Sequence, residues 1–419
     1  MMPRLFLLVA LAARCPAAET AAPAAGDLVL TEAGFLRQVL EQSPRSKLIR
    51  SKLDAAAGER RAAGLLPNPS LQLRREQVSL GGDSQSDSFL EAGFPLDVSG
   101  RRSLRRSAAQ AALDSISEST RADLNRLRTD ALTAFYGVLE TQERQKAMGA
   151  GARRLKVLIE TLRGRAAQAS EYDRIRLERE RAEAEAEAML LQRELAGLKA
   201  EVARLVTWEG DPLALRVSGE LPPPENPLPE PAALRSRLEA RQPLLASLRK
   251  ERERAAVEFR RAGRLWVPDL GLAGGLKSSK AGGQSGTGFT AGIGVVLPLF
   301  DRGLAERQIK ESELSSAESA LESGARDARV ALEAAFVQAR TSRDALSAYR
   351  TTALPQAERL EQMAGLSYLE GRLGILELID AYRGGTSARL KELELALNAR
   401  LDRIKLERVL GEPLEGEAP

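Results

Sequence analysis

The chain contains no histidine and only one cysteine among its 419 residues. Histidine is the commonest general base and metal ligand in proteins, so its absence excludes most hydrolase and zinc chemistries. A single cysteine cannot form an internal disulfide bond. The sequence also lacks a phosphate-binding loop, a catalytic triad and any metal-ligand spacing. We therefore expect a protein that is not an enzyme and that needs no cofactor or metal site.

Neither sign of charge dominates, since 62 basic residues stand against 58 acidic ones. The charges alternate rather than cluster, which argues against a nucleic-acid partner. Long hydrophobic runs are also missing, and no segment approaches the 18 apolar residues of a membrane-spanning helix.

The N-terminus has the pattern of a secretory signal peptide, which we place at residues 1–25. Arg4 precedes an apolar run over residues 5–13, and small residues follow it. Cys15 raises the alternative of a lipidated N-terminus. However, Arg14 stands where a small residue precedes a lipidated cysteine, so the pattern favours a cysteine inside a removed leader.

What the sequence does contain is an internal duplication with a period of about 200 residues. Each half has a proline-containing break, two strand-like segments and a very long charged helical stretch. The first structural repeat is predicted at 26–220 and the second at 221–419. A proline-rich connector over residues 222–231 separates them and is expected to be stiff and extended.

Strands are predicted at about 69–78 and 86–97 in the first repeat and at about 267–278 and 287–299 in the second. A loop is expected at 281–288. Apolar residues alternate with glycine, threonine and charged residues, which gives each strand one apolar and one small or polar face. A soluble four-stranded sheet with one wet face would give the same pattern.

Two long helical hairpins are predicted at 101–207 and 302–411. Residues 101–163 contain no proline, and residues 302–366 contain only Pro355. Each first helix would run on the order of 95 Å at 1.5 Å per residue, far longer than a globular helix. Leucines recur in steps of three and four, as in a coiled coil. The charged run 171–187 is interpreted as a solvated helix face.

The predicted fold is therefore mainly α with a small β part, built from a duplicated strand pair and helical hairpin. Strands of this length can cross a bilayer, but open sheet edges cannot face lipid. Three copies would supply a closed barrel of twelve strands that continues into a barrel of twelve helices.

The sequence resembles the TolC-like family of outer-membrane efflux proteins, and within it the CzcC-like heavy-metal subgroup, over essentially the whole mature chain. The motifs that carry the resemblance are LPNP at 66–69, PLDVSGR at 95–101, LPLFDRG at 297–303, YLEG at 368–371 and ILELIDA at 375–381.

This resemblance implies a homotrimer in the cell outer membrane with a large periplasmic part. It implies an exit duct for a tripartite efflux system, with a periplasmic adaptor and an inner-membrane transporter as partners. The subgroup indicates a transporter of the RND type and metal cations as cargo. Drug or solvent efflux and type I secretion remain alternatives, as does a different class, a periplasmic coiled-coil structural protein.

In the family, the hairpin turns meet the adaptor. The corresponding docking turns here are Ala167, Gln168, Ala169 and Ser170 in the first repeat, and Gly371, Arg372, Leu373 and Gly374 in the second. The family has a glycine where this chain has Ala167, and Gly374 is an additional glycine.

Charged residues just after these turns are candidates for a periplasmic gate. Glu377 and Asp380 are three residues apart and would share one helix face, giving two acidic rings in a trimer. Asp173 and Arg176 occupy the matching positions of the first repeat, and Arg176 could tether the halves by pairing with Asp380 or Glu377. The alternative for the two acidic residues is solvated carboxylates that complement a helix dipole.

Overall fold

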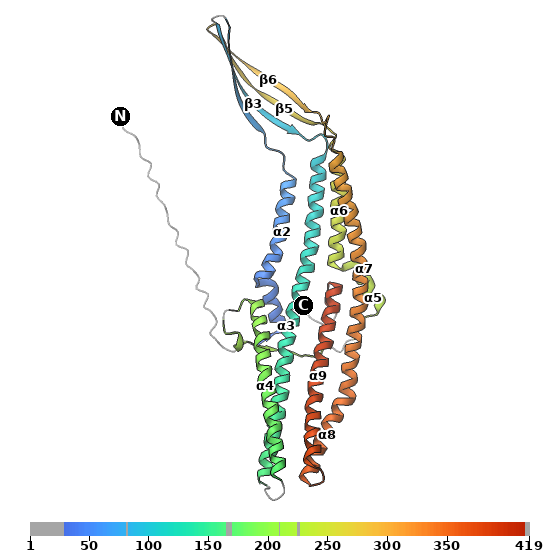
Figure 1. Ribbon diagram of the computed structural model, residues 1–419. Helices are drawn as coiled ribbons and strands as arrows, with labels where there is room; N and C mark the ends of the chain where they lie inside the picture. The colour runs from blue at the N-terminus through green and yellow to red at the C-terminus, as the bar shows by residue number, and fades with distance from the viewer. Residues whose placement is uncertain (1–28, 81–82, 165–169, 209, 224–226, 415–419) are drawn as a thin grey trace, which may run out of the picture.

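The computed structural model describes residues 29–80, 83–164, 170–208, 210–223 and 227–414. A β-sheet forms one end of an elongated molecule, and two helical hairpins form the other (Figure 1). The predicted signal peptide, with Cys15, lies outside the described residues. None of the described helices combines the length and the hydrophobicity needed to cross a membrane.

The duplication predicted from the sequence recurs as two similar successions of elements. The first comprises β1 (Val29–Thr31), α1 (Glu32–Arg37), a π-helical turn (Gln38–Gln42), α2 (Pro44–Ala63), β2 (Ser70–Leu80), β3 (Asp83–Leu96), α3 (Arg101–Gly164), α4 (Glu171–Val206), a 3-10 turn (Pro212–Ala214) and β4 (Arg216–Ser218). The second comprises α5 (Pro231–Arg241), α6 (Pro243–Ala262), β5 (Asp269–Ala281), β6 (Gln284–Val296), α7 (Leu304–Ala348), a π-helical turn (Tyr349–Ala353), α8 (Leu354–Leu369) and α9 (Ile375–Leu410).

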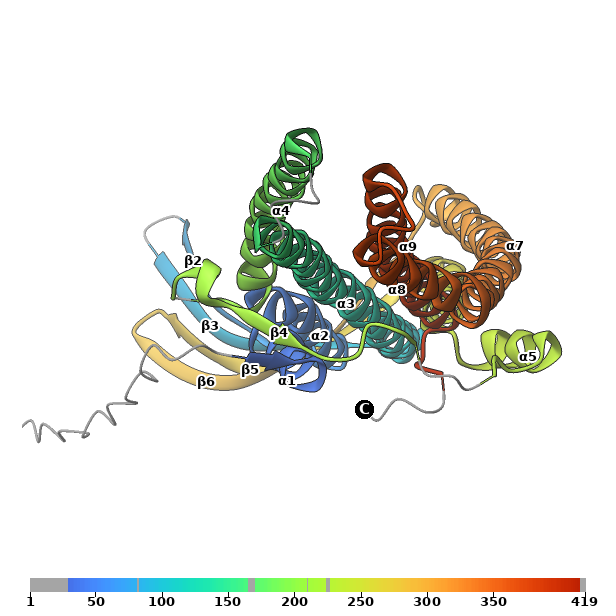
Figure 2. The ribbon, with the colours of Figure 1, turned by 90° about the horizontal axis from the view of Figure 1, so that it is seen from below.

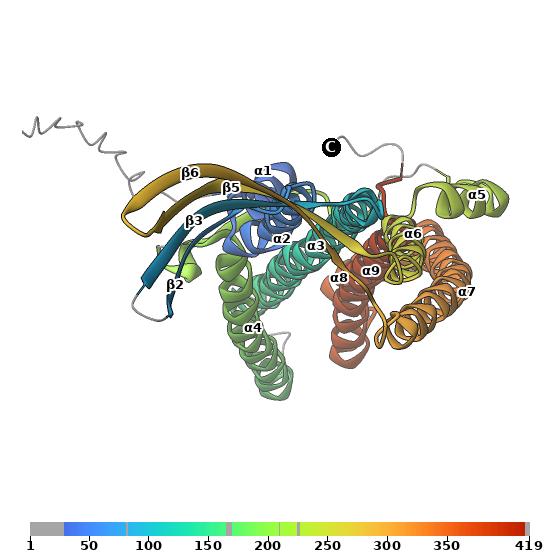
Figure 3. The same ribbon diagram turned by 90° about the horizontal axis from the view of Figure 1, so that it is seen from above.

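The large sheet has four antiparallel strands in the order β2-β3-β5-β6 and curves as one band when seen from above (Figure 3). The loop expected at 281–288 is much shorter in the structure. Gly282 and Gly283 both have positive φ, which permits a two-residue hairpin turn and lets residues 284–288 join the ladder. Strand β6 ends at Val296, just before Pro298, which cannot donate a ladder hydrogen bond.

The strand register brings the apolar rows of all four strands onto one face of the sheet. Leu73, Leu90, Leu276 and Phe289 form one continuous cross-strand row, and Phe94, Leu272 and Ile293 continue another. These side chains are exposed within one chain, with Leu73 at 78% and Phe289 at 84%. An exposed apolar face of this extent marks an interaction surface.

The opposite face of the sheet is polar and internally paired. Lys277 lies 3.0 Å from Asp87, which also accepts a hydrogen bond from Ser279. Arg74 and Lys277 stack over the ring of Phe89 at 4.6 Å and 5.1 Å from its centroid. The sheet thus separates one apolar face from one charged face.

Helix α3 runs without a break through 64 residues, as expected from its lack of proline. The corresponding stretch of the second repeat is interrupted before Pro355 by the π-helical turn. The wider turn accommodates the proline ring and its missing N–H. Seen from below, the two hairpins α3–α4 and α7–α9 stand side by side (Figure 2).

A compact core lies midway along the helices, where the short strands β1 and β4 pair in parallel. Phe35 stacks on Phe135, and both are fully buried. Arg400 of α9 donates hydrogen bonds to the carbonyl oxygens of Glu220 and Pro222 at 3.2 Å and 3.0 Å. This buried arginine fixes the start of the connector between the two repeats.

Candidate functional site at the hairpin turns

Both helical hairpins reverse direction at the same end of the molecule, opposite the sheet (Figure 1). The turn of the first repeat joins α3 to α4, and that of the second joins α8 to α9. Of the first predicted docking turn, Ala167, Gln168 and Ala169 lie outside the described residues. Ser170 is described and is the N-cap of α4.

The polar residues after the first turn are engaged locally. Ser170 and Asp173 form a reciprocal capping box, in which the N–H of Asp173 donates to the Ser170 hydroxyl at 3.2 Å. Arg176 donates to the hydroxyl of Tyr172 at 2.8 Å and lies over its ring. These contacts account for the conformation of α4's first turns.

A different structural motif forms the second turn. Gly371 has a φ of 74°, a left-handed conformation that favours glycine. Its N–H donates to the carbonyl of Tyr368 at 3.0 Å, and the N–H of Arg372 donates to that of Ser367 at 2.8 Å. This pair of bonds is a Schellman motif that ends α8.

Helix α9 begins at Gly374, its N-cap, while Leu373 packs on the apolar cluster of the hairpin end. The predicted gate residues Glu377 and Asp380 both lie in the first two turns of α9 and are exposed. Glu377 is the acidic residue of the first turn, where it complements the helix dipole.

Among the described residues, Arg176 shows no contact with Asp380 or Glu377, so a single chain does not contain the predicted tether. A different arginine connects the repeats. Arg383 of α9 makes a bidentate pair with Glu180 of α4, with Nη2 at 2.5 Å from Oε2, and lies 3.3 Å from Glu183. The hydrogen bond with Glu180 raises the pKa of Arg383 above its usual value.

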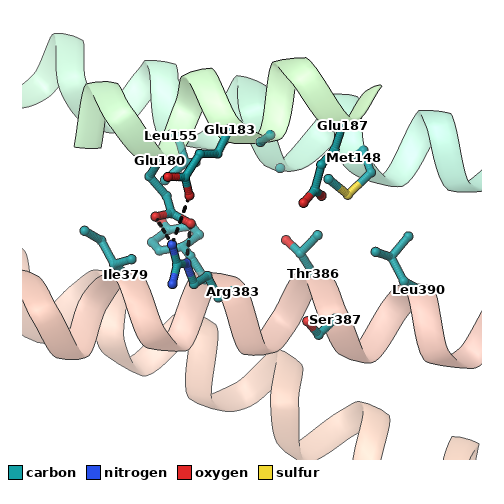
Figure 4. Close-up of a pocket in the computed structure, with 13 residues that line it drawn as sticks. Met148, Leu155, Glu180, Glu183, Glu187, Ile379, Arg383, Thr386, Ser387 and Leu390 are labelled. Carbon is teal, nitrogen blue, oxygen red and sulfur yellow. Dashed lines mark hydrogen bonds and ion pairs between the residues drawn. The ribbon is translucent and has the colours of Figure 1, made fainter. Parts of the chain in front are cut away.

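This pair lies at the wall of a cavity of about 270 Å³ between α3, α4 and α9 (Figure 4). Glu183 and Glu187 of α4 face Thr386 and Arg383 of α9 across it, with Met148 of α3 at one end. The cavity holds both acidic and hydroxyl side chains. No group of residues in the described part of the chain has the composition of a metal site.

A second charged network fixes α8 against its neighbours. The buried carboxylate of Glu361 lies 3.3 Å from Arg154 of α3 and 2.9 Å from Arg389 of α9. A side chain at Gly385 would meet Glu361 at 2.2 Å, so glycine is required there for the close approach. Burial raises the pKa of Tyr382, and the nearby Glu361 raises it further.

The comparisons with known proteins agree with this architecture. The profile of the family described as "Outer membrane efflux protein" matches residues 234–412. The cobalt-zinc-cadmium resistance protein CzcC of Cupriavidus metallidurans is 26% identical over 366 residues, which cover 86% of this chain and 85% of that protein. The second repeat of the chain is therefore similar to the outer membrane efflux protein family.

Solved structures share the fold of this chain along almost its whole length. The outer membrane channel MtrE of Neisseria gonorrhoeae, in its open state, has a TM-score of 0.73 and 17% identity, covering 91% of this chain and 89% of MtrE. CusC has a TM-score of 0.74 and 17% identity, covering 91% and 92% of the two chains. The mainly α fold with a small sheet is thereby confirmed.

Sequence reasoning missed the pair of Glu180 and Arg383 because the run 171–187 was interpreted as a solvated face. That interpretation holds for exposed pairs such as Arg179 with Glu183, at 3.2 Å. Glu180, however, follows the buried Leu177 by three residues and is itself only 8% exposed. The sequence did contain a signal for this ion pair, because a carboxylate at a core-facing position of a heptad pattern predicts a buried ionic partner.

Proposed function

We propose that this protein is the outer-membrane exit duct of a tripartite efflux system and that it works as a homotrimer. The observation that carries the proposal is the sheet itself. Its edge strands β2 and β6 have no further strand beside them among the described residues. Open edges cannot face lipid, so three sheets joined edge to edge, with twelve strands, satisfy all the backbone groups.

The two faces of the sheet support the same arrangement. The apolar rows that contain Leu73, Phe289 and Ile293 would face the hydrocarbon of the outer membrane. The face with Asp87, Lys277 and Ser279 would line a water-filled lumen. A periplasmic coiled-coil structural protein, the alternative of a different class, requires no such exposed apolar face.

The helical hairpins would then form the periplasmic part of the duct. Their turns, Ala167–Ser170 and Gly371–Gly374, are the surfaces proposed to contact a periplasmic adaptor, which links the duct to an inner-membrane transporter. The well-ordered Schellman turn at Gly371 supports a fixed shape at this end.

The gate is proposed to lie just above these turns. Glu377 and Asp380 are exposed at the start of α9 and would form acidic rings in a trimer. The tether between α4 and α9 is assigned to Arg383 and Glu180 instead of Arg176, in addition to the pair of Arg154 and Glu361 that joins α3 to α8. Separation of α4 from α9 would break this bidentate pair, so the pair favours the closed duct.

The cargo proposed is divalent metal cations, with a transporter of the RND type as the partner. This choice rests on the relative CzcC, whose name gives cobalt, zinc and cadmium. The absence of histidine from the chain indicates that selection of the metal occurs in the transporter. Drug or solvent efflux and type I secretion are the competing cargoes.

Disulfide crosslinking between sheet edges tests the trimer. A cysteine replaces Gln77 in β2, and single cysteines are placed in turn along β6. Within one chain the two strands are three strand spacings apart, about 14 Å, which is too far for a disulfide. Any disulfide is therefore intermolecular. The expected products are two-chain and three-chain species in membranes.

Two results separate the alternatives. A membrane-bound chain that forms no crosslink at any β6 position would contradict the closed barrel. A structural coiled-coil protein would instead be released from membranes by a high-salt wash.

For the cargo, a deletion strain should lose tolerance to cobalt, zinc or cadmium. Loss of drug tolerance alone would favour the competing cargo.

A further inference from the structure

The junction between the sheet and the helices carries an unusual number of arginines. Most of them have structural partners. Arg102 and Arg105 donate to the last carbonyl oxygens of α2, and Arg264 donates to the carbonyl of Ser99 at 3.0 Å. Such contacts fix the entry angles of the strands and occupy donor groups of these three arginines.

Four arginines at the same level differ from these. Each is exposed, and none has an ion pair or side-chain hydrogen bond with the described residues: Arg61 in the last turn of α2, Arg106 near the start of α3, Arg260 in the last turn of α6 and Arg302 directly before α7. We call these four residues the basic collar. They come from four separate segments, so they extend across the whole width of the protomer.

The duplication relates two of the four collar arginines. Arg61 and Arg260 are 199 residues apart, the same spacing as Pro69 and Pro268 at the starts of the strand pairs. Both arginines belong to a pair of adjacent arginines that ends a 20-residue helix.

Exposed apolar side chains lie between the collar and the sheet. Leu66 precedes β2 and is 65% exposed, Trp266 precedes β5 and is 62% exposed, and Phe300 follows β6 and is fully exposed. The order along the molecule is therefore an apolar sheet face, then aromatic and aliphatic side chains, then cations. A bilayer presents the matching order of hydrocarbon, interface and headgroup.

The acidic groups at this level are largely engaged elsewhere. Asp301 accepts the N–H of Gly303 at 2.8 Å, and Glu258 pairs with Arg261 at 2.7 Å. The four collar arginines, in contrast, have no ion pair with the described residues.

We propose that the basic collar binds the phosphate headgroups of anionic phospholipids in the periplasmic leaflet of the outer membrane. The proposal rests on the proposed membrane duct. A trimer carries twelve collar arginines in a ring around the duct, which matches a lipid surface that surrounds the protein. A protein partner would require a patch on one side. Each arginine near an anionic surface is worth about a fivefold preference.

The chain offers its own reporter, because it contains only two tryptophans, Trp208 and Trp266. The W208F variant leaves Trp266 as the sole tryptophan, beside the collar. The full-length oligomer is reconstituted into vesicles that contain either brominated phosphatidylglycerol or brominated phosphatidylcholine. Bromine quenches tryptophan fluorescence at short range, so the quenching curves give the relative binding constant of the two lipids at the collar.

The expected result is a preference of at least about fivefold for phosphatidylglycerol, and this preference should decrease as the salt concentration rises. Replacement of the four collar arginines by glutamine should reduce the preference to about one. Replacement by lysine should retain most of it. A matched control removes four exposed arginines elsewhere on the helices: Arg126, Arg153, Arg193 and Arg359. This control should behave like W208F.

Equal quenching by the two lipids, or a preference that survives in the glutamine variant, would overturn the collar. If the glutamine variant does not reconstitute, the salt titration of W208F decides, and a salt-independent preference overturns the collar. Failure of the proposed function has a distinct signature. The W208F chain would then not float with vesicles, and neither brominated lipid would quench Trp266.

Discussion

Replacing Arg383 with glutamine should shift the proposed duct toward its open state. The substitution removes the guanidinium that pairs with Glu180, whose side chain is 11% exposed, and leaves that carboxylate without a cationic partner. A charge-assisted hydrogen bond contributes about 1.5–3 kcal/mol, and breaking a fully buried ion pair costs about 3–5 kcal/mol. The side chain of Arg383 is 51% exposed, so solvent screening lowers the expected loss to about 2 kcal/mol.

A loss of about 2 kcal/mol corresponds to a roughly 30-fold change in the ratio of open to closed channels. Single-channel recording of the trimer in planar lipid bilayers measures this ratio directly. The matched control is R204Q, which removes an exposed pair with Glu201 within α4, at 3.1 Å, and shares no residue with the bridge. Its open probability should equal that of the unmodified protein.

A double-mutant cycle isolates the interaction. E180Q and R383Q should each raise the open probability, and the double variant should do no more than either single one, because both remove the same contact. The exchanged pair, E180R with R383E, should restore closure in part. The reasoning is refuted if R383Q behaves like R204Q, or if the effects of the two single substitutions simply add.

Three other predictions concern the hairpin ends and the mid-level core. G371A places a Cβ on a residue with φ of 74°, at a cost of about 1–2 kcal/mol, and should reduce metal tolerance while the trimer persists. The control is G197A in the middle of α4, where an added Cβ meets no atom within 4 Å, and equal effects would remove the turn from docking. Replacing Glu377 and Asp380 with alanine should raise conductance and weaken block by multivalent cations, and unchanged recordings would leave them as surface charge. Burial raises the pKa of Glu140, so the folded state binds its proton more tightly than the unfolded state, and stability should rise as the pH falls from neutral through that raised pKa. E140Q should therefore stabilise the protein by about 1 kcal/mol at pH 7 and flatten this pH dependence in thermal unfolding; a lower melting temperature would contradict it.

The helices and strands of this fold were predictable because each has a local sequence pattern, and the pattern occurs in both repeats. The absence of proline between residues 101 and 163 predicted the unbroken α3, and the period-two rows predicted which face of each strand is apolar. The cross-strand alignment of Leu90 with Leu276 follows from the same alternation, since a slip of one residue would move every apolar side chain to the other face.

The contacts between the repeats were not predictable in the same way. Matching positions suggested that Arg176 would meet Asp380, because duplication aligns these residues in sequence. In the structure Arg176 turns to Tyr172, four residues away, where the helix itself provides the neighbour. Arg383 and Glu180 are 203 residues apart, and the packing of both α4 and α9 against α3 brings them together.

The bridge between Arg383 and Glu180 lies at a different height along the hairpins from the proposed docking turns. Glu180 is ten residues beyond Ser170, and Arg383 is nine residues beyond Gly374. At 1.5 Å per residue, both ends of the bridge therefore lie about 15 Å above their turns. An adaptor bound at the turns would not touch the bridge directly. It would have to act by moving α4 and α9 apart, and such a movement would break the bridge together with the apolar cluster of Leu177 and Leu378 that lies nearer to the turns.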